Sequence, residues 1–294
     1  MTERPIIAGI GEILWDVFPE RKVLGGAPAN FAYHISQFGL NGYAVSAVGD
    51  DASGKEILAQ LEAKKLKYLI ETVDYPTGTV QVTLDGTGVP QYEICENVAW
   101  DHIPFSEATG ELAGKTDAVC FGSLAQRHVH SRKSILRYLV SMPVDSLKIF
   151  DINLRQHYYS ESVIHDALMA SNVLKTNDEE VVLLSKLYGW GGVDEVTVCK
   201  RLMEQYKLKI VILTKGSKGS AIISTEGVSF LETPQVEVAD TVGAGDAFTA
   251  AFVAGWLMQK EIREAHKLAV EVAAYVCTQH GAMPELPLSL LKPV

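Results

Sequence analysis

Short apolar segments rich in β-branched residues alternate with helical patterns along most of this chain. The runs IIAGIG, YAVSAVG, DAVCFG, LKIFDIN, NVLKTN and KIVILTKG are typical of strands. Helical patterns lie between them, including PANFAYHISQFG, which has Pro28 near its start and Gly39 at its end. Strands that alternate with helices predict a mainly parallel sheet covered on both faces, which is a three-layer α/β/α fold.

One region departs from this alternation of strands and helices. The stretch TGTVQVTLDGTGVPQYEIC alternates apolar and polar residues around DGTG, and this pattern predicts a β-hairpin. The segment EILWDVF alternates in the same way. We therefore expect a single domain over residues 1–294, with a small sheet formed by segments near 12–18 and 70–100 and inserted into the α/β body.

Composition excludes several classes of protein. The chain has 26 Lys and Arg against 36 Asp and Glu, a net charge of -10, which argues against binding to nucleic acid or anionic membranes. No apolar run approaches the roughly 20 residues of a membrane span, and the acidic N-terminal segment does not resemble a signal peptide. Four cysteines without a C-x-x-C pair indicate reduced thiols. We expect a soluble, cytoplasmic protein.

The stretch DTVGAGDAFTAAF, residues 240–252, combines two features that conflict. Gly243, Ala244 and Gly245 form a turn of small residues that leads into an apolar helix, and such a turn can receive an anion on its backbone amides. Asp240 and Asp246 flank the turn and would repel that anion. The residues alone do not say what the two carboxylates do.

Polar clusters follow several of the expected strands. FDINLRQHYY places Asp151, Asn153 and Arg155 at alternate positions as a strand ends. KTNDEE places Asn177 and Glu180 after the next strand, where an N-cap with acids in the first turn is the simpler interpretation. LTKGSKGSA is a strand that ends in a glycine loop. Ligands of open α/β sheets bind at this edge, so the clusters could share one crevice.

The stretch GDDASGKE, residues 49–56, matches most of the phosphate-binding P-loop pattern. Glu56 stands where the pattern needs a Ser or Thr to hold Mg²⁺, and Asp50 and Asp51 would lie inside the phosphate cradle. We interpret this stretch as a turn before a helix that Ser53 could cap.

Two motifs, LGGAPANFA near the N-terminus and DTVGAGDAF near the C-terminus, identify a resemblance to the ribokinase-like (PfkB) carbohydrate kinases over essentially the whole chain. The chain is most similar to the fructokinase branch, because GGAPAN has Ala27 and Pro28 where ribokinases usually have Lys and Gly. The resemblance implies a ribokinase-like domain that binds ATP and a sugar, a small β-sheet lid over the sugar, and a homodimer that pairs through the lids.

The resemblance also implies roles for the residues of each motif. Asp246 is the expected catalytic base, and Gly243, Ala244 and Gly245 form the expected anion hole. The other expected contacts are Asp16, Gly25, Gly26 and Asn30 for the sugar, Arg155 for the sugar or the transferred phosphate, Asn177, Thr214, Gly216 and Gly219 for ATP, Glu180 for Mg²⁺ through water, and Asp240 and Val242 for a monovalent cation such as K⁺.

The implied reaction is transfer of the γ-phosphoryl group of ATP to a hydroxymethyl group of a free sugar, with the 6-hydroxyl of fructose as the first choice. Ribose, a nucleoside, 2-keto-3-deoxygluconate or a sugar phosphate are the alternatives. A phosphosugar is disfavoured because residues 78–100 contain no Lys or Arg. A non-catalytic sugar sensor on a kinase fold is the alternative from another class, and the presence of Asp246 and its glycine turn disfavours it.

Overall fold

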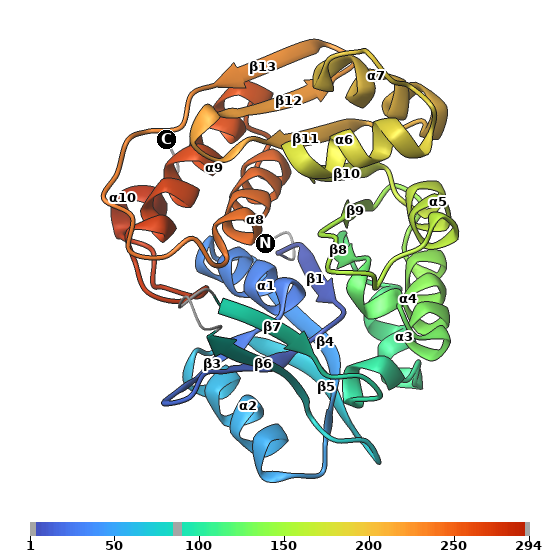
Figure 1. Cartoon of the computed structure of the whole chain (residues 1–294), viewed down its shortest axis with the longest axis vertical. Helices are drawn as coiled ribbons and strands as arrows, with labels where there is room; N and C mark the ends of the chain where they lie inside the picture. The colour runs from blue at the N-terminus through green and yellow to red at the C-terminus, as the bar shows by residue number, and fades with distance from the viewer. Residues whose placement is uncertain (1–3, 85–89, 292–294) are drawn as a thin grey trace.

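The computed structural model describes residues 4–84 and 90–291, and a large sheet runs through the middle of this part of the chain (Figure 1). The order of its strands is β13-β12-β11-β10-β9-β8-β1-β4-β5. These strands are β1 (Ile6–Ile10), β4 (Asn41–Gly49), β5 (Lys67–Val73), β8 (Ala118–Gly122), β9 (Leu147–Asp151), β10 (Val173–Asn177), β11 (Ile210–Thr214), β12 (Ser220–Ser224) and β13 (Gly227–Leu231).

The strands from β5 to β11 are parallel to one another, as the sequence predicts. β12 and β13 continue the sheet in antiparallel pairings, so LTKGSKGSA connects the two strands of a hairpin. The strand β13 was not predicted, because three of its five residues are exposed and its apolar pattern is weak.

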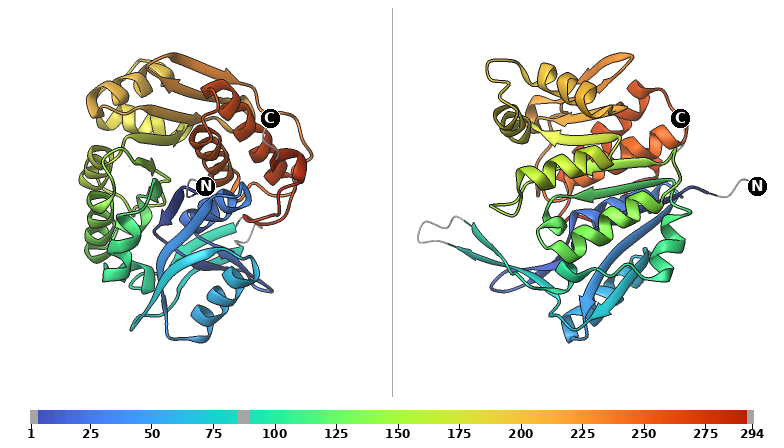
Figure 2. Two further views of the ribbon diagram at one scale, coloured as in Figure 1. Left: turned by 180° about the vertical axis from the view of Figure 1, so that it is seen from behind. Right: turned by 90° about the vertical axis from the view of Figure 1, so that its right-hand side faces the viewer.

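Helices cover both faces of the large sheet, which confirms the three-layer arrangement (Figures 1 and 2). One face carries α1 (Ala27–Gln37), α2 (Ala52–Ala63), α8 (Ala244–Leu257) and α9 (Ile262–Cys277). The other face carries α3 (Glu107–Ala113), α4 (Val129–Ser141), α5 (Glu161–Ala170), α6 (Asp178–Leu187) and α7 (Glu195–Tyr206). The short elements are η1 (Ala99–His102), η2 (Leu124–Gln126), η3 (Gly216–Lys218) and α10 (Leu288–Leu291).

The central strands are mainly apolar because both of their faces are buried. Ile149 packs in the core formed with α1, α8 and α9, whereas the next residue, Phe150, packs in the core on the opposite face. Successive side chains of a strand point to opposite faces of the sheet. Because both faces are buried here, a polar side chain at position 149 or 150 would need a hydrogen-bond partner in the core.

A second sheet of four strands, in the order β3-β2-β6-β7, stands beside the large one. Its strands are β2 (Leu14–Val17), β3 (Lys22–Gly25), β6 (Gly78–Leu84) and β7 (Pro90–Ile94). β6 and β7 are antiparallel, as the hairpin pattern predicts, and they extend away from the large sheet (Figure 2). The predicted turn DGTG falls on residues 85–88, which lie outside the described residues.

Two predictions of detail were wrong, and one strand was not predicted. The small-sheet segment predicted from residue 70 starts too early, because β5 pairs with β4 at the edge of the large sheet. β3 was not predicted, because its four residues are too few to show a period. Asp51, and not Ser53, caps α2: its Oδ1 accepts from the Gly54 N–H at 2.7 Å and its Oδ2 from the Thr77 N–H at 2.8 Å.

The contact between β1 and α1 gives a test of the fold. A Cβ atom on Gly9 would lie 1.9 Å from the carbonyl oxygen of Pro28, in the first turn of α1. Gly9→Ala should therefore push α1 outward and lower the free energy of unfolding by about 1–3 kcal/mol, the usual cost of overpacking.

Urea unfolding measures this loss. Gly191→Ala is the matched control, because a Cβ on Gly191 meets no atom within 4 Å. A Gly9→Ala variant as stable as Gly191→Ala would contradict the close approach of β1 and α1.

Candidate active site

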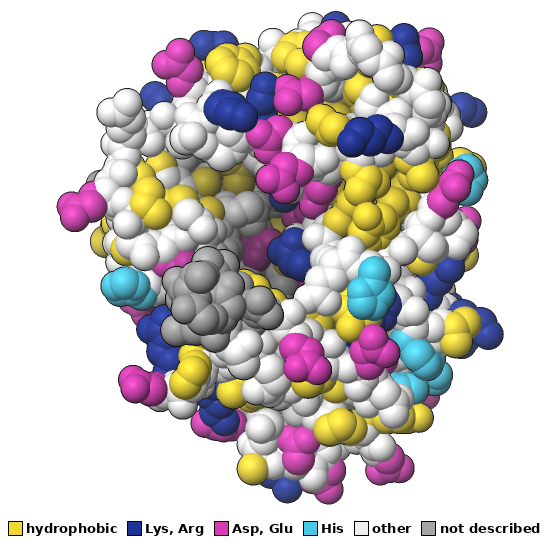
Figure 3. Space-filling view, viewed as in Figure 1, with side chains coloured by type: hydrophobic (Ala, Val, Ile, Leu, Met, Phe, Trp, Pro, Cys, Tyr) yellow, Lys and Arg dark blue, Asp and Glu magenta, His cyan; other side chains and the backbone are white. Residues whose placement is uncertain are grey.

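The ends of several parallel strands meet the first turns of α1 and α8 in one hollow of the molecule. Asp151 and Asn177 are the last residues of β9 and β10, and Asp246 lies in the first turn of α8. Acidic and basic side chains lie together at the floor of this hollow (Figure 3). The crevice predicted at this edge of the sheet is therefore present among the described residues.

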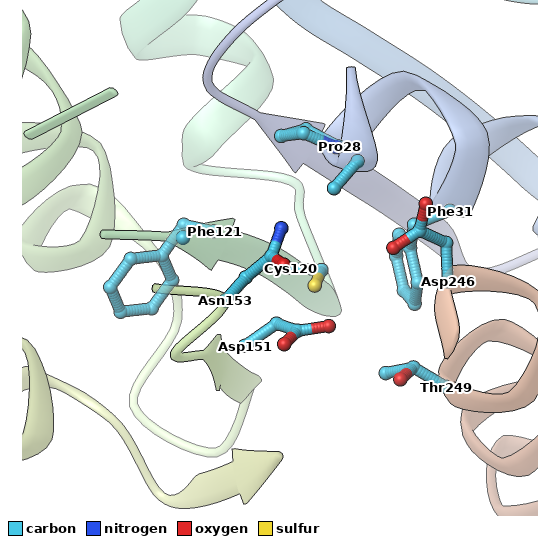
Figure 4. A pocket seen from close by; sticks show the side chains of 10 residues that line it. Pro28, Phe31, Cys120, Phe121, Asp151, Asn153, Asp246 and Thr249 are labelled. Atoms are coloured by element: carbon cyan, nitrogen blue, oxygen red, sulfur yellow. The ribbon is translucent and has the colours of Figure 1, made fainter. Parts of the chain in front are cut away.

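Asp246 projects from α8 toward the strand ends. The Asn30 side chain, on α1, donates from Nδ2 to Asp246 Oδ2 at 2.8 Å. Asp246 faces Asp151 across a narrow cavity of about 10 Å³, which Pro28 and Asn153 also line (Figure 4). Burial, together with the charge of Asp151, raises the pKa of Asp246 to about 7.

The turn before α8 has a shape that only glycine allows. Gly243 caps the helix with φ 77°, and a Cβ at this position would lie 2.6 Å from the Cβ of Ala282. The Ala244 N–H points back to the Thr241 carbonyl at 3.3 Å. The next two amides belong to the first turn of the helix and have no acceptor within it. The turn therefore presents the amides of Gly245 and Asp246 to the hollow.

Lys175 is a site residue that the sequence analysis missed. Its ammonium lies 3.2 Å from Asp151 Oδ1, and both side chains are under one-tenth exposed. A Cβ on Gly245 would lie 3.4 Å from Lys175 Nζ, so this charge adjoins the first turn of α8. Burial lowers the pKa of Lys175, but Asp151, Glu180 and Asp246 together raise it above its usual value. A lysine within the apolar strand NVLKTN was the available signal.

The small sheet contributes Asp16, which lies in β2 beside the glycine pair that precedes α1. A Cβ on Gly25 would lie 2.6 Å from Asp16 Oδ2, and one on Gly26 would lie 2.4 Å from the Glu12 carbonyl oxygen. Glycine is thus required at position 26, which also has φ 121°, whereas a side chain at position 25 would displace the Asp16 carboxylate. Burial raises the pKa of Asp16 to about 6, although Arg155 lowers it. Asp16, Gly25, Gly26 and Asn30 are brought together as predicted.

Arg155 lies at the outer side of the hollow. Its side chain is exposed, and Nη1 donates to the Leu154 carbonyl at 3.0 Å. The guanidinium lowers the pKa of Asp16, Glu12 and Asp246, so it lies within electrostatic reach of all three. Glu12 is the second residue that the sequence analysis missed, and an acid inside the buried run GIGEIL was the available signal.

A larger cavity, of about 900 Å³, opens on the other side of the α8 first turn. Its lining includes Thr214, Gly216 and Gly219 together with Ala244 and Gly245. Gly219 has φ 106°, and a Cβ there would lie 2.5 Å from the Leu231 carbonyl oxygen. The predicted nucleotide loop and the predicted anion hole therefore border the same cavity.

Asn177 and Glu180 form a capping box at the start of α6. Asn177 Oδ1 accepts from the amides of Glu179 and Glu180, and Glu180 Oε2 accepts from the Asn177 N–H at 2.9 Å. Glu180 Oε1 also accepts from the Leu154 N–H at 3.0 Å, which ties the end of β10 to the segment that carries Arg155. The simpler interpretation of KTNDEE as a cap is confirmed, and the cap lies at the site.

Asp240 lies apart from Asp246 and lines neither cavity. Its Oδ1 accepts from the Val242 N–H at 3.0 Å, and its Oδ2 accepts from the Gly281 N–H at 3.1 Å. These contacts join the loop before α8 to the loop after α9. Asp240 thereby helps to hold the turn that carries the free amides.

Residues 4–84 and 90–291 contain no group of three or more His, Cys, Asp or Glu side chains arranged to hold a metal ion directly. None of the helices in the same ranges has the length and apolar character to cross a membrane.

Known proteins match the chain over most of its length. It is 29% identical over 280 residues to an ATP-dependent 6-phosphofructokinase of Thermoanaerobacterium thermosaccharolyticum, covering 91% of this chain and 83% of the relative. It is 27% identical over 299 residues to a fructokinase of Vibrio alginolyticus, covering 94% of each. An uncharacterized sugar kinase from Pyrococcus horikoshii, solved in complex with ATP, superposes with a TM-score of 0.80 at 27% identity, covering 95% and 94% of the chains.

The family model of the pfkB family carbohydrate kinases matches residues 13–288. This range contains both motifs on which the resemblance was based, the small sheet and the strand ends that form the hollow. The chain therefore belongs to the pfkB family of carbohydrate kinases.

Proposed function

We propose that the protein transfers the γ-phosphoryl group of ATP to a hydroxymethyl group of a neutral free sugar, with the 6-hydroxyl of fructose as the preferred acceptor. One observation carries the proposal: the first turn of α8 separates the cavity of about 900 Å³ from the sugar-side residues Asp16 and Asn30. A phosphoryl group that passes from ATP to sugar would cross this turn, where amides and the Asp246 carboxylate lie.

Asp246 is the catalytic base in this proposal. A base works best when its pKa lies near the working pH, and burial raises the pKa of Asp246 to about 7. The Asn30 amide fixes one carboxylate oxygen, Oδ2, which leaves Oδ1 to accept the proton of the sugar hydroxyl. General base catalysis of this kind contributes about 10² to 10⁴-fold to the rate.

The amides of the α8 first turn and the Lys175 ammonium would stabilise the charge on the phosphoryl group in flight. Phosphoryl transfer depends mainly on positioning and on electrostatic stabilisation. Lys175 adjoins Gly245, and Asp151 holds its ammonium in place at 3.2 Å. In other enzymes, the loss of one amide donor of an anion hole costs about 10² to 10³-fold.

Asn177 and Glu180 are the residues that would hold Mg²⁺, through water. Both Glu180 oxygens accept backbone amides, so the carboxylate is fixed in direction and fits a bridged contact rather than a direct ligand. When bound, Mg²⁺ would offset most of the charge of the nucleotide phosphates. A monovalent cation at Asp240 and Val242 stays a prediction. Both carboxylate oxygens of Asp240 already accept hydrogen bonds from backbone N–H groups.

The choice of fructose is supported by the fructokinase relative and by the chemistry of the small sheet, which would act as a lid. A phosphosugar would need positive charge there. Between β2 and β3, Arg21 lies over the Phe18 ring. Lys22, on β3, is engaged with Glu56, and its ammonium lies 4.6 Å from the centroid of the Trp15 ring. Because one relative is a 6-phosphofructokinase, a phosphosugar is the main alternative to fructose as the acceptor. The homodimer and the cytoplasmic location stay predictions.

An ADP-release assay over a panel of free sugars and sugar phosphates tests the function. We expect fructose to raise ATP turnover most, and a Glu204→Gln variant, altered on the exposed surface of α7, to behave as wild type. If no sugar raises turnover above the background, the kinase proposal is wrong and the sensor alternative replaces it.

The role of Asp246 is tested by Asp246→Asn. The variant should lose about 10² to 10⁴-fold in kcat because the amide cannot accept the proton. It should still bind an ATP analogue with wild-type affinity in calorimetry, since the nucleotide cavity is unchanged. Turnover within a few fold of wild type would remove Asp246 from the role of base.

The same variant should gain stability at high pH. In the folded protein the pKa of Asp246 rises from 3.8 to about 7, so the folded state binds the proton more tightly and stability falls as pH rises between these values. Asn does not ionise, so Asp246→Asn should exceed wild type in free energy of unfolding at pH 8 and lose this advantage toward pH 4. Each unit of pKa difference is worth about 1.4 kcal/mol. Urea unfolding of both proteins at pH 8 and at pH 4 measures this advantage. The same difference in free energy of unfolding between variant and wild type at both pH values would contradict the raised pKa.

A further inference from the structure

Glu12 is a buried carboxyl group whose presence neither the fold nor the proposed mechanism explains. It follows β1 and Gly11, and only 4% of the residue is exposed. Its Oε2 has no hydrogen-bond partner among the described residues, and it forms no ion pair with any of them. A buried, unpaired carboxyl is costly, so its retention calls for a ligand or another functional reason.

The backbone around Glu12 is fixed in place. The Gly11 N–H donates to the Val45 carbonyl at 3.1 Å, and Ser46 Oγ donates to the Gly11 carbonyl at 2.6 Å. The Glu12 carbonyl lies against Gly26, where a Cβ would approach it to 2.4 Å. Glu12 therefore lies directly beneath the glycine pair that precedes α1.

The groups that act on Glu12 are those of the active site. Burial raises the pKa of Glu12 to about 7; Arg155 lowers this pKa, and Asp246 and Asp151 raise it. These three residues come from the segment after β9, from α8 and from the end of β9, so Glu12 lies within electrostatic reach of the hollow that they surround.

A second acceptor nearby also lacks a partner. Asn30 Oδ1 is buried and accepts no hydrogen bond within the described ranges, while Asn30 Nδ2 is used by Asp246. Two buried acceptors on the sugar side of the site require donors, and a polyhydroxy sugar supplies O–H donors. A carboxylate or phosphate group has no such donor at neutral pH, and on the sugar side it would meet the carboxyl groups of Glu12, Asp16 and Asp246. Arg155 lies at the outer side of the hollow, and the Lys175 ammonium is held by Asp151 beside the first turn of α8.

We propose that Glu12 determines the acceptor specificity of this kinase, by accepting a hydrogen bond from a hydroxyl of a neutral sugar and by repelling acidic sugars. The inference rests on the proposed function, which it deepens. It assigns the choice between a free sugar and a sugar acid or sugar phosphate to a residue beneath the sugar, whereas the lid argument assigns it to charge above the sugar.

Two variants separate the two parts of the proposal. Glu12→Gln keeps the size of the side chain and removes its charge, so KM for fructose should rise about tenfold or more. In this variant the ratio of kcat/KM for 2-keto-3-deoxygluconate or fructose 6-phosphate to that for fructose should also rise at least tenfold. Glu12→Asp keeps the charge but withdraws it by one methylene, so KM for fructose should rise without any gain for the two acidic probes.

Two controls show that a change is specific. Glu204→Gln, on the exposed surface of α7, should leave all of these values at the wild-type level. Affinity for an ATP analogue, measured by calorimetry, should be unchanged in both Glu12 variants because the cavity of about 900 Å³ does not include Glu12. If Glu12→Gln does not fold, Glu12→Asp still carries the test through KM for fructose.

The outcomes are distinct for the two proposals. Wild-type KM and selectivity in both variants, with an active wild-type enzyme, would overturn the role of Glu12 and leave the kinase proposal standing. A wild-type enzyme that is active only on the acidic probes would overturn the role of Glu12 and the preference for a neutral sugar. A wild-type enzyme that is inactive on every probe would overturn both the kinase function and the role of Glu12.

Discussion

The close approach of Gly243 to Ala282 fixes the first turn of α8, and the chemistry of the site depends on that turn. A side chain at position 243 would collide with Ala282, and φ 77° would strain it further. Asp240 holds the same turn from outside by accepting amides of Val242 and Gly281. The constraint places two free amides and the Asp246 carboxylate within one turn of helix. In the proposed reaction, an anion-binding terminus and an acid can coexist there because the acid, with a pKa of about 7, would face a hydroxyl rather than a phosphate.

Charge in the hollow is divided between the two sides of this turn. Beside the cavity of about 900 Å³, Lys175 is buried against Asp151 and adjoins Gly245, so positive charge lies where phosphates would pass in the proposed reaction. Beside the glycine pair before α1, Glu12 and Asp16 are carboxyls whose pKa values burial raises to about 7 and about 6. One side is thus suited to an anion and the other to hydroxyl groups. This division is what a transfer from ATP to a neutral sugar requires, and it would be unfavourable for an acceptor that is itself an anion.

Much of the fold could be predicted because it depends on periodicity. The apolar runs predicted the parallel strands, and the alternation in TGTVQVTLDGTGVPQYEIC predicted the pairing of β6 with β7. The motifs predicted which glycines and acids would meet, and Asn30 does contact Asp246. Short edge strands such as β3 carry too few residues to show a period. Lys175 and Glu12 were missed because a single charged residue within an apolar run looks like an exception in a sequence. Only the packing of β9, β10 and α8 shows that both lie near one hollow.

The pH dependence of kcat/KM for the sugar tests the central claim most directly, because it reports the ionisation of the free enzyme. With Asp246 as the base, kcat/KM should be level above about pH 7 and should fall about tenfold for each pH unit below it. The same acidic limb should persist in Glu12→Gln, because this variant retains Asp246. A kcat/KM that stays constant from about pH 5.5 to 8.5, with a sugar that the enzyme phosphorylates and with ATP saturating, would contradict the assignment of proton transfer to Asp246.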